Sequence, residues 1–441
     1  MARRQRRRRE PETARIDSVT HDGRGIAAID GKKVFVAGAL LGEEVRFQRR
    51  KSHRNFDEAE LLEVLEASSQ RIDARCEAYG RCGGCSLQHM SDEQQRQIKQ
   101  QTLRDNLERI GQVTPATWLD PITGPIWNYR RRARLAVKEV YAKGRVLVGF
   151  RERHAPFITD MHRCEVLAEP VDSMIDPLSE LIGGLSISAR LPQVEVAVAD
   201  NAVALVLRVL DAPSDDDVEL LCAFGKQHNV RIFLQSGGPD SIALLYPGSA
   251  VDSLYYDLTE FDVRIEFDAI GFVQVNSEIN QRMVSRAIEL LEPGAEDRVL
   301  DLYCGIGNFS LPLARRVSAV LGVEGEAMLV KAATGNAALN NIDNASFRQA
   351  DLSAIDGSEG WLSEGWDLVL LDPARSGAQE IANHIDKIGP RRIVYVSCHP
   401  GTLARDAGTL VNEKGYKAEA AGIIDMFPHT THVESIAVFS K

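Results

Sequence analysis

The sequence predicts an α/β protein whose C-terminal part holds a parallel β-sheet covered by helices, preceded by a small β-barrel and a mixed α+β domain. Three observations predict this arrangement. From about residue 272 the chain repeats a strand, a loop and a helix, the rhythm of right-handed βαβ units. Residues 13–70 hold short strand candidates between glycine-containing turns. Between these regions, strand-like runs alternate with polar turns.

Length and charge narrow the class of protein. At 441 residues, of which 44% are hydrophobic, the chain can form roughly two or three domains. The formal net charge of −11 argues, as an average, against a nucleic-acid partner. Arginines nevertheless cluster at residues 1–9, 49–55 and 129–135. We assign the first cluster to a basic tail, residues 1–12, and expect the other two, which lie beside aromatic residues, to contact RNA.

The expected compartment is the cytoplasm. No segment approaches the ~18 apolar residues that span a bilayer, and the basic N-terminus lacks the apolar stretch of a secretory signal. Seven cysteines, an odd number, indicate a reducing compartment rather than a disulfide framework. We expect a cytoplasmic monomer.

The N-terminal strands predict a closed barrel of the oligonucleotide-binding type. Five strand candidates lie between residues 13 and 70, and Asp30-Gly31 is a hairpin signal between two of them. The basic run at 49–55 favours RNA contact over a purely structural barrel. A helix then follows, with Ser91 as its N-cap, Gln94 completing a capping box and Gly111 ending it.

Acidic residues end the first three predicted parallel strands, where an open α/β sheet binds its ligands. They are Asp301, Glu324 and Asp351, and a glycine turn, DLYCGIGNFS, follows the first strand. The pattern G-x-G-x-x-S does not complete the dinucleotide fingerprint. Carboxylates placed for ribose hydroxyls and an adenine amino group predict an S-adenosylmethionine site, and nicotinamide binding remains the alternative.

The fourth and fifth strands end in the motifs DPAR and SCHP, which contain Asp372 and Cys398. A buried cysteine is often only a small hydrophobe, but a thiol beside a methyl donor also suits methylation of a pyrimidine. Because pyrimidine C5 is a poor nucleophile, thiolate addition to C6 activates it, and a general base must later remove the C5 proton. Glu434 is the preferred base, ahead of His429 and His432.

Three cysteines within ten residues predict a metal centre. Cys76, Cys82 and Cys85 form a C-x5-C-x2-C pattern, and Cys164 stands far downstream. Thiolates suit zinc and iron–sulfur clusters alike, so the spacing leaves both metals open.

The motifs DLYCGIGNF, LLDPARSG, VSCHPGTLARD and MFPHTTHVES together resemble the RNA 5-methyluridine methyltransferases, over nearly the whole chain. The resemblance implies a class I, Rossmann-like, S-adenosylmethionine-dependent methyltransferase domain in residues 94–126 and 272–441. It also implies a TRAM barrel in residues 13–70, and a central iron–sulfur and RNA-binding domain in residues 76–93 and 127–271.

Roles for single residues follow from the same resemblance. It implies that Cys398 is the nucleophile, that Glu434 is the base, and that a 4Fe–4S cluster has Cys164 as its fourth ligand. It further implies cofactor contacts from six residues, namely Gln274, Tyr303, Asn308, Glu324, Asp351 and Asp372. His399 departs from the family, which more often has asparagine there.

The barrel, the cysteines and the DPAR form point to the branch of the family that methylates 23S ribosomal RNA. Relatives that act on tRNA typically read DPPR instead. Two alternatives stay open. One is the same chemistry on another ribosomal or tRNA uridine, and the other is an inactive RNA-binding assembly factor. The presence of Cys398, Asp372 and Glu434 argues against an inactive protein.

Overall fold

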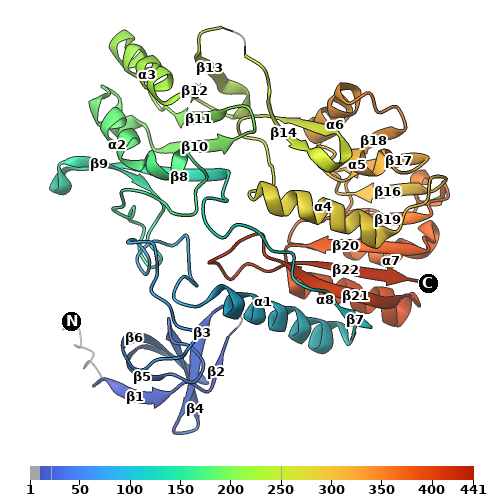
Figure 1. Cartoon of the computed structure of the whole chain (residues 1–441), viewed down its shortest axis with the longest axis horizontal. Coiled ribbons are helices and arrows are strands. Elements are labelled where there is room, and N and C mark those ends of the chain that lie inside the picture. Colours follow the sequence, from blue (N-terminus) through green and yellow to red (C-terminus); the bar gives the residue numbers. More distant parts are fainter. Residues whose placement is uncertain (1–9, 21, 250) are drawn as a thin grey trace, which may run out of the picture.

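The computed structural model describes residues 10–20, 22–249 and 251–441, and residues 1–9 of the predicted basic tail lie outside these ranges. Figure 1 shows a small barrel at one end of the molecule and two larger layered parts beside it. Within the described ranges, no helix combines the length and apolar composition needed to cross a membrane.

The N-terminal strands form one six-stranded sheet that closes on itself. Its order is β1-β5-β6-β4-β3-β2, and because β2 follows β1 after two residues, its two edge strands are one bent segment. The strands are β1 (Glu12–Arg15), β2 (Ser18–Val19), β3 (Arg24–Ile29), β4 (Lys32–Ala37), β5 (Glu44–Ser52) and β6 (Phe56–Glu66). Val34, Val45 and Phe47 are fully buried inside. The closed topology is consistent with the predicted barrel.

The central sheet has six strands in the order β13-β12-β11-β10-β8-β9. They are β8 (Arg132–Val140), β9 (Arg145–Gly149), β10 (Gln193–Val198), β11 (Val203–Arg208), β12 (Val230–Gln235) and β13 (Ile242–Tyr246). Helices α2 (Ile175–Gly184) and α3 (Asp215–His228) share a hydrophobic core with one face of this sheet.

The C-terminal sheet has eight strands in the order β18-β17-β16-β19-β20-β22-β21-β7. They are β7 (Thr117–Trp118), β16 (Arg298–Leu302), β17 (Ala319–Glu324), β18 (Ala345–Gln349), β19 (Leu368–Leu371), β20 (Arg392–Ser397), β21 (Lys417–Ile424) and β22 (Glu434–Ser440). All five predicted parallel strands form and pair in parallel. The order reverses between β16 and β19, which places the ligand-binding crevice there.

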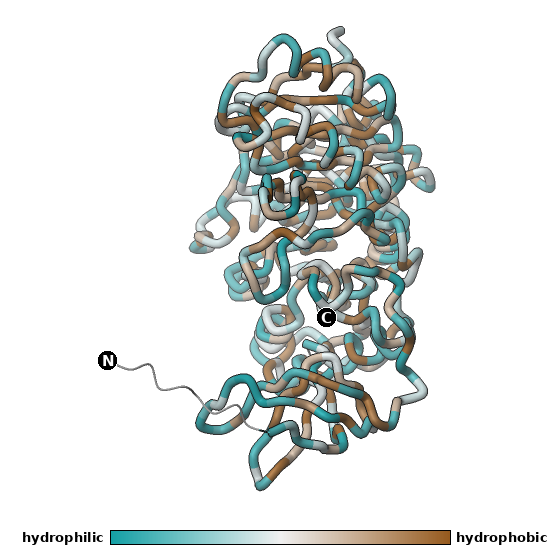
Figure 2. Tube along the Cα trace, turned by 90° about the vertical axis from the view of Figure 1, so that its left-hand side faces the viewer, coloured by the Kyte–Doolittle hydropathy of each residue, from teal (hydrophilic) through white to brown (hydrophobic). Residues whose placement is uncertain are grey.

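Helices cover both faces of this sheet. On one face lie α4 (Ser277–Leu291), α5 (Ser310–Ala314) and α6 (Ala327–Leu339), and on the other α1 (Asp92–Asn106), α7 (Gln379–Ile388) and α8 (Pro400–Gly408). Along β19, alternate residues enter the two cores, as the two-residue period of a strand requires. In Figure 2 the hydrophobic stretches run through the interior of these layers.

The predicted cap of α1 is confirmed, because the Ser91 side chain accepts from the backbone N–H of Gln94. Gly111 ends the helical segment for a reason beyond flexibility. A Cβ there would lie 2.4 Å from the carbonyl oxygen of Ala404, so α8 can approach closely only when this position is glycine. The left-handed residue is Gln112, one position later.

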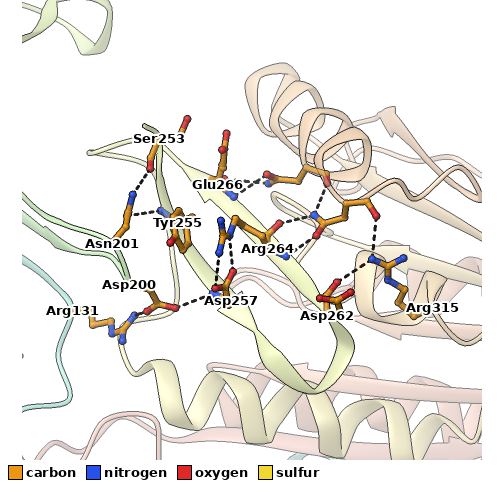
Figure 3. A network of polar contacts seen from close by, with 12 residues as sticks. Arg131, Asp200, Asn201, Ser253, Tyr255, Asp257, Asp262, Arg264, Glu266 and Arg315 are labelled. Atoms are coloured by element: carbon orange, nitrogen blue, oxygen red, sulfur yellow. Dashed lines mark hydrogen bonds and ion pairs between the residues drawn. The ribbon is translucent and has the colours of Figure 1, made fainter. Parts of the chain in front are cut away.

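A hairpin of β14 (Leu254–Leu258) and β15 (Val263–Phe267) links the central and C-terminal sheets. Figure 3 shows its polar contacts on both sides. The Asp200 carboxylate, on the turn between β10 and β11, pairs with Arg131 and accepts from the backbone of Asp257. The side chains of Asn336, on α6, and of Asn340, which caps its end, bond the backbone of β15. The hairpin therefore fixes one sheet against the other.

Candidate active site

One cavity of about 800 Å³ gathers most of the residues singled out in the sequence. It lies at the carboxyl ends of β16, β17, β19 and β20, where the sheet order reverses. Eleven of the twelve predicted site residues line it: Gln274, Tyr303, Asn308, Glu324, Asp372, Cys398, Glu434, Cys76, Cys82, Cys85 and Cys164.

The first wall of the cavity, the turn wall, consists of Gly305, Asn308 and Glu324. The Glu324 carboxylate accepts from the backbone N–H groups of Gly305, at 3.1 Å, and Gly325, at 2.6 Å. Gly307 adopts φ +95°, a conformation that other residues rarely take, and this lets the chain turn tightly from β16 into α5. Backbone amides therefore hold the glutamate in place beside the turn.

Asn308 is fixed by two residues that the sequence reading did not single out. Its side-chain oxygen accepts from the Tyr256 hydroxyl at 2.9 Å and from the Asn280 amide at 3.0 Å. Tyr256 lies on the β14–β15 hairpin and Asn280 on α4, outside the repeated strand-end pattern. Tyr256 also lines the cavity.

Asp351 does not join the turn wall. It follows β18, is exposed to solvent, and is absent from the cavity lining. Its carboxylate accepts from the backbone and the hydroxyl of Ser353, and these hydrogen bonds lower its pKa. Of the three strand-end acids, only Glu324 lines the cavity, since Asp301 is fully buried, where its carboxylate accepts from the Ser310 hydroxyl.

The second wall, the thiol wall, consists of Asp372, Cys398 and Glu434. β20 and β22 pair antiparallel with Ser397 opposite Ser435, so Cys398 and Glu434, one residue further along, face each other at the sheet end. Asp372 follows β19, the other neighbour of β20. The sheet register thus brings together three side chains that are far apart in the sequence.

Burial controls the protonation of the thiol wall. It raises the pKa of Asp372 to about 7. Burial, followed by the nearby charge of Asp372, raises the pKa of Glu434 to about 8. Burial and both carboxylates raise the pKa of the Cys398 thiol to about 11, while the Arg375 guanidinium acts in the opposite direction. Perturbed acids that share a cavity with a thiol are typical of catalytic sites.

Arg375 is a functional candidate that the sequence reading passed over, although the DPAR motif contains it. Its guanidinium lines the cavity and lies 3.3 Å from the His432 ring nitrogen Nδ1. It lowers the pKa of both Cys398 and Glu434. Arg375 therefore favours the charged forms that nucleophilic and base chemistry require.

The segment before Glu434 packs against α1, which contacts it through Lys99. Lys99, fully buried, pairs with Asp425 at 2.6 Å and donates to the carbonyl of Phe427 at 2.9 Å. The His429 ring stacks on Trp127, and this histidine is not part of the cavity lining. Among the three predicted base candidates, His432 and Glu434 reach the cavity and His429 does not.

The four predicted metal ligands form a third group in the same cavity. Burial raises the pKa of each thiol, that of Cys85 to about 11 and that of Cys164 to about 12. The Cys82 sulfur accepts from the backbone N–H of Gly84 at 3.4 Å. Across the described ranges, no three His, Cys, Asp or Glu side chains are arranged to hold a single metal ion.

Comparison with known proteins gives consistent results. A family model described as tRNA (Uracil-5-)-methyltransferase matches residues 257–441. A Methylococcus capsulatus protein named 23S rRNA (uracil(1939)-C(5))-methyltransferase RlmD is 48% identical over 98% of this chain and 97% of its own. A Legionella pneumophila protein of the same name is 47% identical, with the same coverage.

A solved structure shares the fold. The Pyrococcus abyssi tRNA (uracil-54, C5)-methyltransferase, in complex with S-adenosyl-L-homocysteine, superposes with a TM-score of 0.74 at 24% identity. The match covers 97% of this chain and 100% of the other. The α/β class I fold predicted from the sequence is thereby confirmed.

Proposed function

The chain belongs to the family of 23S ribosomal RNA uracil-C5 methyltransferases, and from this membership we propose that it methylates C5 of a uridine in 23S ribosomal RNA with S-adenosyl-L-methionine as donor. The name of its relatives identifies the target as uracil 1939. One observation carries the proposal. The thiol wall and the turn wall line one cavity, so a methyl donor and a base can meet at Cys398.

The turn wall binds the methyl donor. Glu324, already oriented by two backbone amides, accepts from the ribose hydroxyls. Asn308, Tyr303 and Gln274 contact the rest of the molecule from the cavity lining. Asp351 reaches the adenine amino group after release from Ser353. The Asp372 carboxylate stabilises the positive sulfonium, which in turn favours its ionised form.

The thiol wall activates the base. Cys398 first loses its proton to water, a loss that the neighbouring Arg375 guanidinium favours. The thiolate then adds to C6 of the uracil, and the electron pair of the C5–C6 double bond moves to C5 and O4 as an enolate. The ionised Asp372 carboxylate accepts a hydrogen bond from N3–H of the uracil and so orients the base. C5 then takes the methyl group, so the sulfonium loses its charge and the enolate is consumed.

Release requires a proton acceptor. Glu434 removes the proton from C5, the C5–C6 double bond forms again, and the Cys398 sulfur leaves as thiolate. The antiparallel pairing of β20 with β22 keeps Glu434 and Cys398 at the same end of the sheet. Each residue returns to its starting state after Glu434 loses its proton to water.

We propose that the cysteine group holds a 4Fe–4S cluster, the metal centre that the resemblance to the methyltransferase family implies. Four thiolates also suit a zinc ion, which is the alternative. The apolar side chains of Phe150 and Met161 line the same cavity as the cysteines. The cluster would supply no electrons, because methyl transfer is redox-neutral, so its role is structural or RNA-positioning.

Metal analysis tests the cluster independently of methylation. Protein prepared without oxygen should contain about four irons per chain. It should lose them when Cys85 is replaced by serine, whereas Cys222→Ser, at a half-buried position of α3, should retain them. Stoichiometric zinc without iron would overturn the assignment.

Methyl transfer to defined RNAs tests the main proposal. The protein is incubated with methyl-labelled donor and either a 23S ribosomal transcript, the same transcript with cytidine at 1939, or tRNA. We expect label on C5 of uridine 1939 in the first transcript alone. Label on tRNA alone would support the tRNA alternative, which the name of the matching family model raises. No label on any RNA would support the inactive assembly factor.

A further inference from the structure

The face of the central sheet opposite α2 and α3 carries a second hollow, of about 860 Å³. We define it as the arginine pocket, because four guanidinium groups line it against two carboxylates, namely Arg134, Arg151, Arg153 and Arg208 against Glu152 and Glu195. Arg134, Glu195 and Arg208 project from β8, β10 and β11, on the side opposite α2 and α3. Nothing in the reaction proposed above uses this site.

Three of these arginines are oriented without being neutralised. Arg151 donates to the carbonyl of Pro156 at 3.0 Å, Arg153 to that of Cys85 at 2.8 Å, and Arg208 to that of Gly237. Carbonyl oxygens fix a guanidinium but leave its full charge. Among the ion pairs of the described residues, none involves these three, whereas Arg134 pairs with Glu195 at 2.9 Å. The pocket therefore presents net positive charge on prearranged donors.

The basic clusters that the sequence emphasised differ in this respect. In the barrel, Arg49 pairs with Glu12 and Asp57, both at 2.6 Å, and Arg50 and Lys51 each meet a glutamate of β6. In the cluster at residues 129–135, Arg131 pairs with Asp200. Most of the charge expected to contact RNA is thus balanced within the protein. In the arginine pocket, by contrast, Arg151, Arg153 and Arg208 hydrogen-bond to carbonyl oxygens and not to carboxylates.

The arginine pocket adjoins the active-site cavity. Gly84 and Phe150 line both. The segment that supplies Arg151 and Arg153 is hydrogen-bonded to the cysteine loop, since Gly83 donates to the carbonyl of Arg151 at 2.9 Å and Arg153 donates to that of Arg81 at 2.8 Å. A strand of RNA that delivers one base to Cys398 can therefore continue past this loop into the pocket.

We propose that the arginine pocket binds backbone phosphate of the RNA substrate, one or more nucleotides away from the methylated uridine. This inference rests on the proposed function for the identity of the ligand. Guanidinium groups match phosphate oxygens with paired hydrogen bonds, and such contacts fix the register of a strand without reading its sequence. The pocket thus determines how strongly the RNA is held, while the cavity determines which atom is methylated.

The test measures RNA affinity as a function of salt for Arg208→Gln, Arg151→Gln and the double variant. Arg190→Gln is the matched control, because Arg190 lies in the same domain, outside the pocket, and is paired with Asp211. Each pocket variant should weaken binding of a 23S transcript containing uridine 1939 by roughly tenfold, as for one lost charged hydrogen bond. It should also lower the slope of log affinity against log salt by about one. The double variant should lower this slope by about two, and the control should match the wild type.

Affinity and slope equal to those of the wild type in the double variant would overturn the inference, including the case in which the pocket serves an acidic protein instead of RNA. Donor binding, measured by calorimetry, verifies that each variant is folded. The result is separable from the proposed function. If the wild type binds the transcript but never methylates it, the proposed reaction fails, while the salt slopes still decide the role of the pocket.

Discussion

The turn wall and the thiol wall of the active-site cavity each contain a glutamate, and the two are held in opposite ways. Glu324 accepts hydrogen bonds from backbone amides at the end of β17. Glu434 is half-buried near Asp372, and desolvation together with that second acid raises the pKa of its carboxyl to about 8. Donors directed at a carboxylate favour its charged form, whereas burial near a second acid favours the protonated form.

The two glutamates therefore suit two different roles, ligand binding and proton transfer. A carboxylate fixed by backbone donors suits the holding of a ligand, because its orientation is set before the ligand arrives. A carboxyl whose pKa lies near neutral pH suits proton transfer, because both of its forms are accessible. Substitutions in the turn wall should therefore weaken donor binding, whereas substitutions in the thiol wall should slow the reaction itself.

The largest expected effect is the loss of the thiol. Cys398→Ala should lower turnover by at least ~10³-fold, as expected when a nucleophile is removed, and leave the affinity for S-adenosylmethionine near that of the wild type. Cys222→Ala removes another half-buried thiol, far from the cavity lining, and should retain turnover. Multiple-turnover methylation and calorimetry measure the two quantities. Substantial methylation by Cys398→Ala would show that Cys398 is not the nucleophile and that the two walls do not differ in role.

Removal of the turn-wall carboxylate should weaken donor binding but leave the covalent chemistry intact. Glu324→Ala should weaken donor binding by about 1–3 kcal/mol, the range for hydrogen bonds to a charged group. The exposed Glu413 provides a control with the same charge change. At a saturating donor concentration the variant should still form the covalent RNA adduct. Unchanged affinity in calorimetry would remove Glu324 from the donor site.

The rate of adduct breakdown should depend on pH through Glu434. The base must be ionised to accept the C5 proton, and its pKa is raised to about 8, so the active fraction falls about tenfold for each pH unit below that value. Breakdown should therefore accelerate from pH 6 to about 8 and then level off. A pulse-chase experiment on preformed adduct measures it. A rate that is flat across this range would assign the proton transfer to another group.

The smallest effect is expected at Asp351. Its carboxylate is exposed and already accepts two hydrogen bonds from Ser353, so Asp351→Asn should weaken donor binding much less than Glu324→Ala does. A loss as large as that of Glu324→Ala would place Asp351 fully in the donor site. The comparison of the two variants thus tells whether the third strand end takes part as strongly as the second.

Much of the fold could be predicted because each parallel strand carries its own local signal. A continuous apolar run followed by a loop and a helix marks β16, β17, β19 and β20 individually, and topology then places their ends together. The β14–β15 hairpin and the two-residue strand β7 carry no such signal. Both are defined by what they pack against, which depends on the folded chain.

The site shows the same limit. Cys398 and Asp372 could be predicted because strand ends converge, whereas Tyr256 and Lys99 act through partners on distant elements. The sequence predicts that the basic run at 49–55 contacts RNA, and the structure shows that several of its charges are paired within the protein. Its pairing with acids of β1 and β6 depends on strand register, which a charge count does not show. Whether a cluster of arginines is free to bind RNA therefore depends on which acids the fold places beside it.

The covalent adduct with RNA tests the central claim most directly. Glu434→Gln and Cys398→Ala are each incubated with donor and 23S transcript, then run on denaturing gels. Glu419→Gln serves as the control, because Glu419 lies on β21, bonded to Ser440 and outside the cavity lining. Glu434→Gln should permit attack and methyl transfer but block release, so a slow-migrating, methylated adduct should accumulate. Cys398→Ala should form none, and the control should turn over normally. An adduct with Cys398→Ala, or rapid turnover by Glu434→Gln, would contradict the account.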